Sequence, residues 1–310
     1  MIVSDRPFRF GAQLRGANSG HEWREKCRSV ETLGYDTLAV ADHFPRGLGP
    51  FTALASAAAV TDRIRVGSFV LANDFRHPAV LAKETATLDL LSDGRLEVGI
   101  GAGWLRSEYE ATGIPFDSAG VRIDRLEEAI PLIKRLWTEE HVTAQGRFYT
   151  ATDLSILPHP VQSPHPPVMV GGGGRRILSL AARLADIVAL NPRATAAGAP
   201  DHRDITAAAT AQKLAWVRDA AGERFPDLEL NIVVLRVVPT HDREAAADRL
   251  AQELQLTPGE ILESPHVLLG TADEMAETLR QRRGQFGISY ITVTEDGLQP
   301  FAAVIERLAT

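Results

Sequence analysis

The second predicted strand of this chain ends in a carboxylate and an imidazole, Asp42 and His43. Successive strand side chains point to opposite faces, so we expect the two residues to have different roles. Histidine titrates near neutral pH and can donate or accept a proton beside a reacting carbon or oxygen. A histidine here can equally well cap a helix or bind a backbone carbonyl, and these two residues alone leave both interpretations open.

Glycines follow two further predicted strands. The fourth strand runs into Gly-Ile-Gly-Ala-Gly-Trp at 99–104, where missing side chains let a planar or phosphorylated ligand approach the backbone. The fifth runs into Gly-Gly-Gly-Gly-Arg-Arg at 171–176, directly before a helical run from Ile177 to Leu184. Free N–H groups and the positive end of a helix dipole bind anions, so this order predicts a phosphate site rather than a flexible turn. The glycine spacing at 99–104 matches neither a P-loop nor a Rossmann fingerprint.

These residues require strands and helices to position them, and β-rich runs alternate with helical spacing along the chain. This alternation predicts eight βα units and a parallel sheet, which we interpret as a closed (β/α)8 TIM barrel. The strands are expected at Phe8–Leu14, Thr37–Ala41, Ile64–Leu71, Leu96–Ile100, Val168–Gly171, Ile187–Leu190, Leu230–Val238 and Ser289–Thr294. Helices over 271–285 and 298–308 should bracket the last strand. Catalytic groups of such barrels lie at the carboxyl ends of the strands.

Two long segments without regular periodicity are expected to overhang that carboxyl face. They run from Thr138 to Pro167 and from Asn191 to Asp204, and insertions of this length are usually lids or binding loops.

The composition favours one soluble domain that acts on small molecules. The chain has 310 residues, 45% of them hydrophobic, which suits a single barrel over 1–310. Its formal net charge is -7 and its basic residues are scattered, so we expect neither nucleic-acid nor membrane binding. The first residues resemble no signal peptide, and a single cysteine, Cys27, excludes a disulfide within the chain. We therefore expect a cytoplasmic protein.

A metal-dependent hydrolase is a weaker interpretation. Five histidines could be considered as ligands, but their spacing follows no recognised metal pattern, so no metal site is predicted. They are His21, His43, His77, His159 and His165.

Several motifs together resemble the luciferase-like monooxygenase superfamily, and more narrowly the coenzyme F420-dependent oxidoreductases of actinobacterial type. They are Asp-His at 42–43, Phe-Arg-His-Pro at 75–78, Asp-Gly-Arg at 93–95 before the fourth strand, and the glycine-rich end of the fifth strand. The resemblance runs in order from about Phe8 to about Leu190.

The resemblance implies a barrel that holds a deazaflavin or flavin in its mouth, usually as a homodimer. His43 would be the proton donor or acceptor, and a bulge with a non-proline cis peptide would fall near Phe69-Val70. The cofactor would contact Asp42, Phe69, Val70, Ala72, Ala102, Gly103, Ser107, Gly172, Gly173, Gly174, Arg175, Arg176 and Ile177. The substrate pocket would include Gln13, Asn73 and Trp104.

The chain also departs from these relatives. Those that oxidise a sugar phosphate carry a glutamate where this chain has Trp104 and bind the phosphate through lysines, whereas no lysine follows Lys213. Sugar-6-phosphate oxidation is therefore not expected, and Trp104 suits an apolar or planar substrate. His43 is left as the sole strong candidate for proton transfer.

We expect an oxidoreductase that uses coenzyme F420 for hydride transfer to or from a small organic substrate. An FMN-dependent monooxygenase, supplied with reduced flavin by a partner reductase, is the alternative among enzymes. A barrel that binds a flavin or deazaflavin without catalysis is the alternative among binding proteins.

Overall fold

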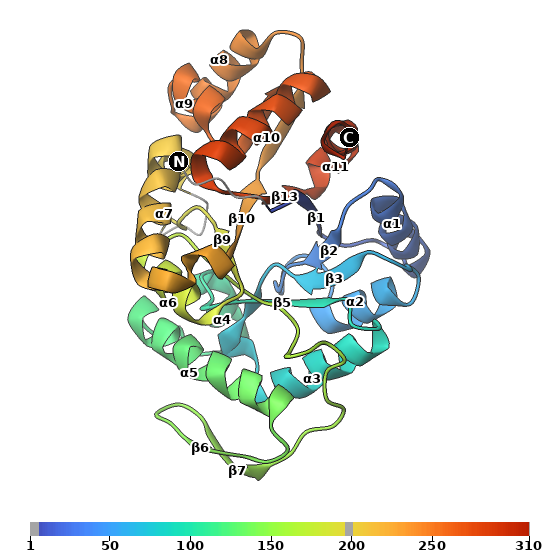
Figure 1. Cartoon of the computed structure of the whole chain (residues 1–310), viewed down its shortest axis with the longest axis vertical. Helices are drawn as coiled ribbons and strands as arrows, with labels where there is room; N and C mark the ends of the chain where they lie inside the picture. The colour runs from blue at the N-terminus through green and yellow to red at the C-terminus, as the bar shows by residue number, and fades with distance from the viewer. Residues whose placement is uncertain (1–5, 196–200, 310) are drawn as a thin grey trace.

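A ring of parallel strands forms the centre of the molecule in the computed structural model, which describes residues 6–195 and 201–309 (Figure 1). The strands of the ring are β1 (Arg9–Leu14), β2 (Thr37–Val40), β3 (Arg65–Ser68), β5 (Leu96–Gly101), β8 (Val168–Gly172), β9 (Ile187–Leu190), β10 (Glu229–Val234) and β13 (Tyr290–Thr294). The ring is closed because β3 pairs with both β2 and β5, and every pairing within it is parallel. The predicted (β/α)8 TIM barrel is confirmed.

Helices surround the ring of strands (Figure 1). They are α1 (Gly20–Thr32), α2 (Pro50–Ala58), α3 (Pro78–Leu91), α5 (Ala119–Thr138), α6 (Arg175–Leu184), α7 (Ala207–Ala221), α10 (Ala272–Phe286) and α11 (Leu298–Leu308). Short helices follow several strands: η1 (Asn73–Phe75), α4 (Arg106–Thr112), η2 (His202–Ile205) and η4 (Glu295–Gly297). A further short helix, η3 (Gly222–Asp227), directly follows α7. No helix among the described residues is both long and apolar enough to span a bilayer.

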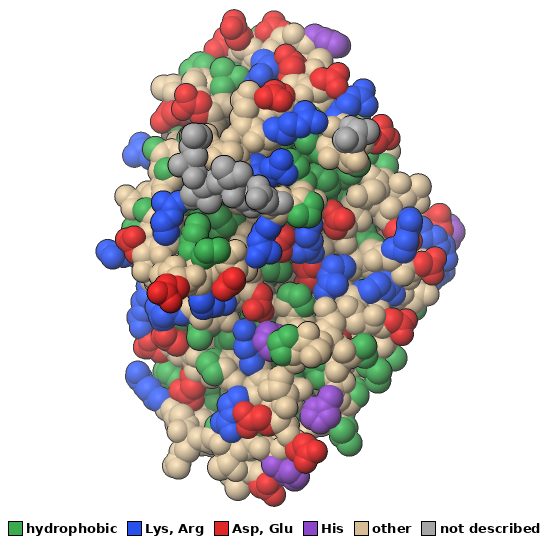
Figure 2. All heavy atoms as spheres, viewed as in Figure 1, with side chains coloured by type: hydrophobic (Ala, Val, Ile, Leu, Met, Phe, Trp, Pro, Cys, Tyr) green, Lys and Arg blue, Asp and Glu red, His purple; other side chains and the backbone are tan. Residues whose placement is uncertain are grey.

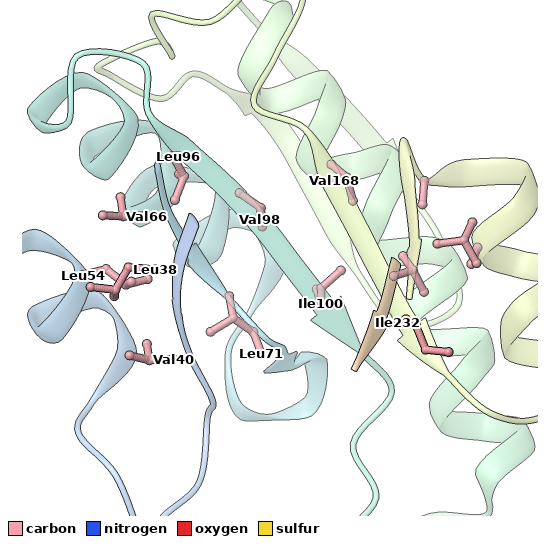
Figure 3. Packing of buried hydrophobic residues seen from close by; sticks show 14 of the residues in the cluster. Leu38, Val40, Leu54, Val66, Leu71, Leu96, Val98, Ile100, Val168 and Ile232 are labelled. Atoms are coloured by element: carbon pink, nitrogen blue, oxygen red, sulfur yellow. The ribbon is translucent and has the colours of Figure 1, made fainter. Parts of the chain in front are cut away.

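The main core lies between the strands and the helices. Leu38 and Val40 of β2 point outward to Leu54 of α2, and Val98 of β5 lies in the same layer (Figure 3). Each such buried side chain contributes about 1.5–3 kcal/mol. On the visible face of the molecule, acidic and basic side chains are interspersed, so neither sign dominates it (Figure 2).

A bulge interrupts the third barrel strand. Val66 pairs with Leu96, but Leu71, in β4 (Leu71–Ala72), pairs with Ile100, so one extra residue lies on the strand-three side. The predicted strand 64–71 is therefore two segments, and the peptide between Phe69 and Val70 is cis, as the resemblance implied.

Gly99 is required beside this bulge. Its N–H donates to the Ser68 hydroxyl (3.0 Å), and that hydroxyl donates to the Gly99 carbonyl (2.8 Å). A Cβ at this position would lie 2.0 Å from the Ser68 carbonyl oxygen, so only glycine allows the approach.

The predicted strand 230–238 also divides. The chain leaves the barrel at Leu235, whose N–H donates to the carbonyl of His266 (2.8 Å). It continues as β11 (Arg236–Pro239), which pairs with β12 (Val267–Gly270) outside the ring. Two helices that the sequence did not predict, α8 (Arg243–Leu254) and α9 (Pro258–Glu263), lie between β11 and β12 in the chain.

The expectation that 138–167 overhangs the carboxyl face is wrong. This segment follows a helix rather than a strand, so it returns to the amino end of the barrel. There the Val98 N–H donates to the Pro167 carbonyl oxygen (2.9 Å). It contains a hairpin, β6 (Val142–Gln145) and β7 (Thr150–Leu154), which lies beside α5 (Figure 1). The segment 191–204 follows β9 and does reach the carboxyl face, although 196–200 lie outside the described residues.

Candidate functional site

A cavity of about 860 Å³ opens at the carboxyl end of the barrel strands. Residues at or just beyond the carboxyl ends of seven of the eight barrel strands line it: Gln13, Ala41, Gly101, Gly171, Asn191, Val233 and Thr294. This is the face on which barrel proteins carry their chemistry, and the volume is that of a site for a cofactor-sized ligand.

His43 lines this cavity and is held by a carboxylate. Its Nδ1 lies 2.9 Å from Oε1 of Glu108, and the same oxygen accepts the backbone N–H of Phe44 (3.1 Å). Glu108 is 4% exposed and belongs to α4, the short helix that follows the glycine-rich end of β5. The Trp104 ring stands edge-on to the imidazole, with 5.8 Å between the ring centroids. The imidazole is thus fixed on two sides, while the cavity adjoins it.

The contact between His43 and Glu108 was not predicted from the sequence, which left His43 as the sole strong candidate for proton transfer. Glu108 also lines the cavity, and it reaches His43 from the helix although Trp104 occupies the loop position where relatives carry a glutamate. The available signal was an acidic residue four positions after Trp104, but nothing in the sequence indicates that α4 turns this residue inward.

Asp42 plays a different part from His43, as strand alternation predicted. Both of its oxygens accept from the Arg76 guanidinium, one of them at 3.0 Å, and it also accepts the Ala72 N–H (3.1 Å). These contacts join the end of β2 to β4 beside the cavity, so Asp42 positions the wall next to the bulge.

The glycines after β8 form a cradle at the start of α6. Gly172, Gly173 and Gly174 all line the cavity, and Gly174 is the N-cap with no side-chain cap. The first N–H groups of a helix have no intrahelical acceptor, so they are available to an anion. A Cβ at Gly173 would lie 2.6 Å from the Asn191 carbonyl oxygen, whereas one at Gly174 would have nothing within 4 Å. Gly174 therefore borders open space.

Arg122 lines the cavity from α5 and donates to the Ala102 carbonyl, just beyond β5, the strand next to β8. Arg175 and Arg176 are exposed and are not among the lining residues, and Arg176 pairs instead with Asp124. Arg122 lines the cavity at 7% exposure, lies 4.0 Å over the Phe116 ring and has no carboxylate partner among the described residues. Burial lowers the pKa of Arg122.

Sequence reasoning missed Arg122, although a signal existed. It precedes Leu126 and Ile130 at intervals of four on α5, so helical spacing places it on the buried face.

The other predicted site residues divide into two groups. Those that line the cavity are Gln13, Phe69, Val70, Ala72, Ala102, Gly103, Trp104 and Ile177. Ser107 is exposed and outside it, and Asn73, 1% exposed, donates to the Tyr149 hydroxyl (3.1 Å) instead. Among the described residues no group of three or more His, Cys, Asp or Glu could hold a metal ion.

Comparisons with curated protein sequences find F420-dependent and flavin-dependent enzymes among the relatives of this chain. The chain is 38% identical to an F420-dependent glucose-6-phosphate dehydrogenase of Intrasporangium calvum over 51% of this chain and 49% of the relative. It is 30% identical to an FMNH2-dependent dimethylsulfone monooxygenase of Pseudomonas putida, over 53% and 46% of the two chains. The chain thus spans about half the length of the curated relatives it matches.

Solved structures share the whole fold. An F420-dependent secondary alcohol dehydrogenase in complex with an F420-acetone adduct superposes with a TM-score of 0.75 at 20% identity, over 98% of this chain and 99% of the other. A monooxygenase of Streptomyces bottropensis superposes with a TM-score of 0.73 at 26% identity, over 96% of each chain. The model of the luciferase-like monooxygenase family matches residues 3–286, and the chain therefore belongs to that family.

Proposed function

We propose that this protein is an oxidoreductase that uses the deazaflavin coenzyme F420 for hydride transfer to or from a small organic substrate. The observation that carries the proposal is the His43–Glu108 pair, which lines the same cavity as the glycine cradle. The F420-dependent glucose-6-phosphate dehydrogenases among its relatives support this choice of cofactor.

The residues present fit a ligand with a flat ring and an anionic chain. Gly101 and Gly171 lie beside Val70, and a Cβ at Gly101 would lie 3.0 Å from the Val70 side chain. Because both positions are glycine, no side chain fills the cavity there. The cradle and Arg122 would hold the anionic chain. When bound, the deazaflavin would supply a ring carbon that accepts or donates hydride.

His43 would move the proton that accompanies the hydride. If Nδ1 carries its proton toward Glu108, the unprotonated Nε2 can accept a proton from a substrate hydroxyl, and it can return that proton in the reverse direction. The buried carboxylate then stabilises the imidazolium that forms and keeps the ring oriented. Trp104 would limit the space in which the substrate approaches His43.

A turnover screen tests the proposal. Oxidised F420 is offered with secondary alcohols and sugar phosphates, and reduced F420 with ketones and unsaturated compounds, while the deazaflavin absorbance is followed. We expect turnover with apolar or planar compounds and none with glucose 6-phosphate. A His43→Ala variant that retained full turnover would remove the proton-transfer role.

The FMN-dependent relative of Pseudomonas putida supports a second candidate, an oxygen-dependent monooxygenase to which a partner reductase supplies reduced flavin. Oxygen consumption with reduced FMN distinguishes this activity from F420 chemistry. Binding of either cofactor without any turnover would instead indicate the non-catalytic barrel.

We also propose a cytoplasmic homodimer formed through α3. This helix exposes Val80, Leu90 and Leu91, the last with 63% of its surface accessible. Exposed apolar groups gathered on one element are typical of an interface. Light scattering at micromolar concentration should give twice the mass of one chain, and a Leu91→Arg variant should shift it toward the monomer.

A further inference from the structure

The cavity has two ends on opposite sides of the barrel. Around the ring β8 is four strands from β1, in the order β1, β13, β10, β9, β8, so the two strands face each other across eight. The glycine cradle follows β8. Arg15 follows β1 and Arg46 follows β2, and both line the cavity on the far side.

Arginines outnumber carboxylates among the side chains that line this cavity. Its arginines are Arg15, Arg46, Arg122 and Arg193, and its two carboxylates are Asp42 and Glu108. Both carboxylates are already bound, to Arg76 and His43 respectively. Arg15 pairs with Asp296 and Arg193 with Asp204, so Arg46 and Arg122 are the lining arginines that have no carboxylate partner among the described residues.

The arginines at the far end differ in their partners. Arg15 forms an ion pair with Asp296, whereas Arg46 makes no ion pair and no hydrogen bond with any residue that the structure describes. A cation without a protein partner on a cavity wall can take its partner from a ligand.

The backbones that carry Arg15 and Arg46 touch each other. Gly47 has a φ of +86°, and a Cβ there would lie 2.8 Å from the Arg15 carbonyl oxygen, so glycine allows the loop after β2 to pack against the end of β1. Trp104 lines the same cavity, is 39% exposed and stands against His43. The unpaired Arg46 and the Trp104 ring therefore line the same cavity as the proton-transfer group His43.

We propose that the substrate is an organic acid, whose carboxylate binds Arg46 and whose planar apolar body lies against Trp104. This inference rests on the proposed function, because it assigns the cradle end to the cofactor and the far end to the substrate. It deepens the proposal by giving the substrate class.

The test uses 2-naphthoate and its uncharged analogue 2-naphthamide as probes. Calorimetry measures the Kd of each with the full-length protein, with and without saturating F420. In the Arg46→Ala variant we expect the Kd of naphthoate to rise about fivefold and that of naphthamide to stay within a factor of two. Arg24→Ala, on the outside of α1, is the matched control and should change neither Kd.

Three outcomes would overturn the inference: no naphthoate binding at millimolar concentration, equal losses for both probes in Arg46→Ala, or displacement of naphthoate by F420. Each can occur while F420 itself still binds. Conversely, a protein that binds naphthoate through Arg46 but does not bind F420 would refute the proposed function and leave the anion site in place.

Discussion

Replacing Glu108 with glutamine tests the pairing on which the mechanism depends. The substitution keeps the shape and the hydrogen bond to the Phe44 N–H but removes the charge 2.9 Å from His43 Nδ1. A hydrogen bond to a charged group contributes about 1.5–3 kcal/mol. Because Glu108 is buried, we expect Glu108→Gln to lower kcat by about 10- to 150-fold.

The assay is the initial rate of F420 reduction or oxidation with a substrate from the screen, combined with a double-mutant cycle. If the two residues act as a unit, the Glu108→Gln/His43→Ala protein should be no slower than His43→Ala alone. Glu110→Gln, on the exposed side of the same helix, is the matched control. Fully additive losses, or an unchanged kcat in Glu108→Gln, would refute the reasoning.

Two further predictions concern the cradle and the stability of the fold. Gly174→Ala adds a methyl group at an extended φ of -93°, where no protein atom lies within 4 Å, so it should leave the melting temperature unchanged. Because the methyl group enters the cradle, it should weaken F420 binding about tenfold. The control Gly284→Ala, on α10, should leave F420 binding unchanged. Burial lowers the pKa of His266 from 6.5 to about 3. Between pH 6.5 and about pH 3 the unfolded chain therefore binds a proton at His266 that the folded chain does not, so the free energy of unfolding falls by about 1.4 kcal/mol for each pH unit within this window. Urea unfolding at several pH values measures how steeply the free energy of unfolding depends on pH. This dependence should be shallower in His266→Asn than in the control His21→Asn, and equal slopes would contradict the assignment of the pH dependence to His266.

Periodicity and glycine placement predicted the barrel well. Strands covered on both faces are continuous apolar runs, so most were located to within a residue or two, and the order strand, glycines, helix placed the cradle correctly. The seventh strand was extended too far, because β11 continues the apolar run but pairs with β12 rather than with the barrel. A local pattern carries no information about that pairing.

The pairs that build the site were harder to predict. Glu108 reaches His43 across 65 positions of sequence, and nothing local distinguishes it from an exposed glutamate such as Glu110. Arg175 and Arg176 adjoin the cradle in sequence, yet they point outward, and Arg122 arrives from a different helix. Proximity in sequence indicated the glycine cradle but not Arg122.

The central claim is that this cavity binds a deazaflavin in preference to a flavin. Titration of the purified protein with coenzyme F420 and with FMN, followed by quenching of cofactor fluorescence, tests it directly. The account predicts saturable binding of F420 with a Kd at least about tenfold below that of FMN, a difference of about 1.4 kcal/mol. Tighter binding of FMN, or no saturable binding of F420, would contradict it.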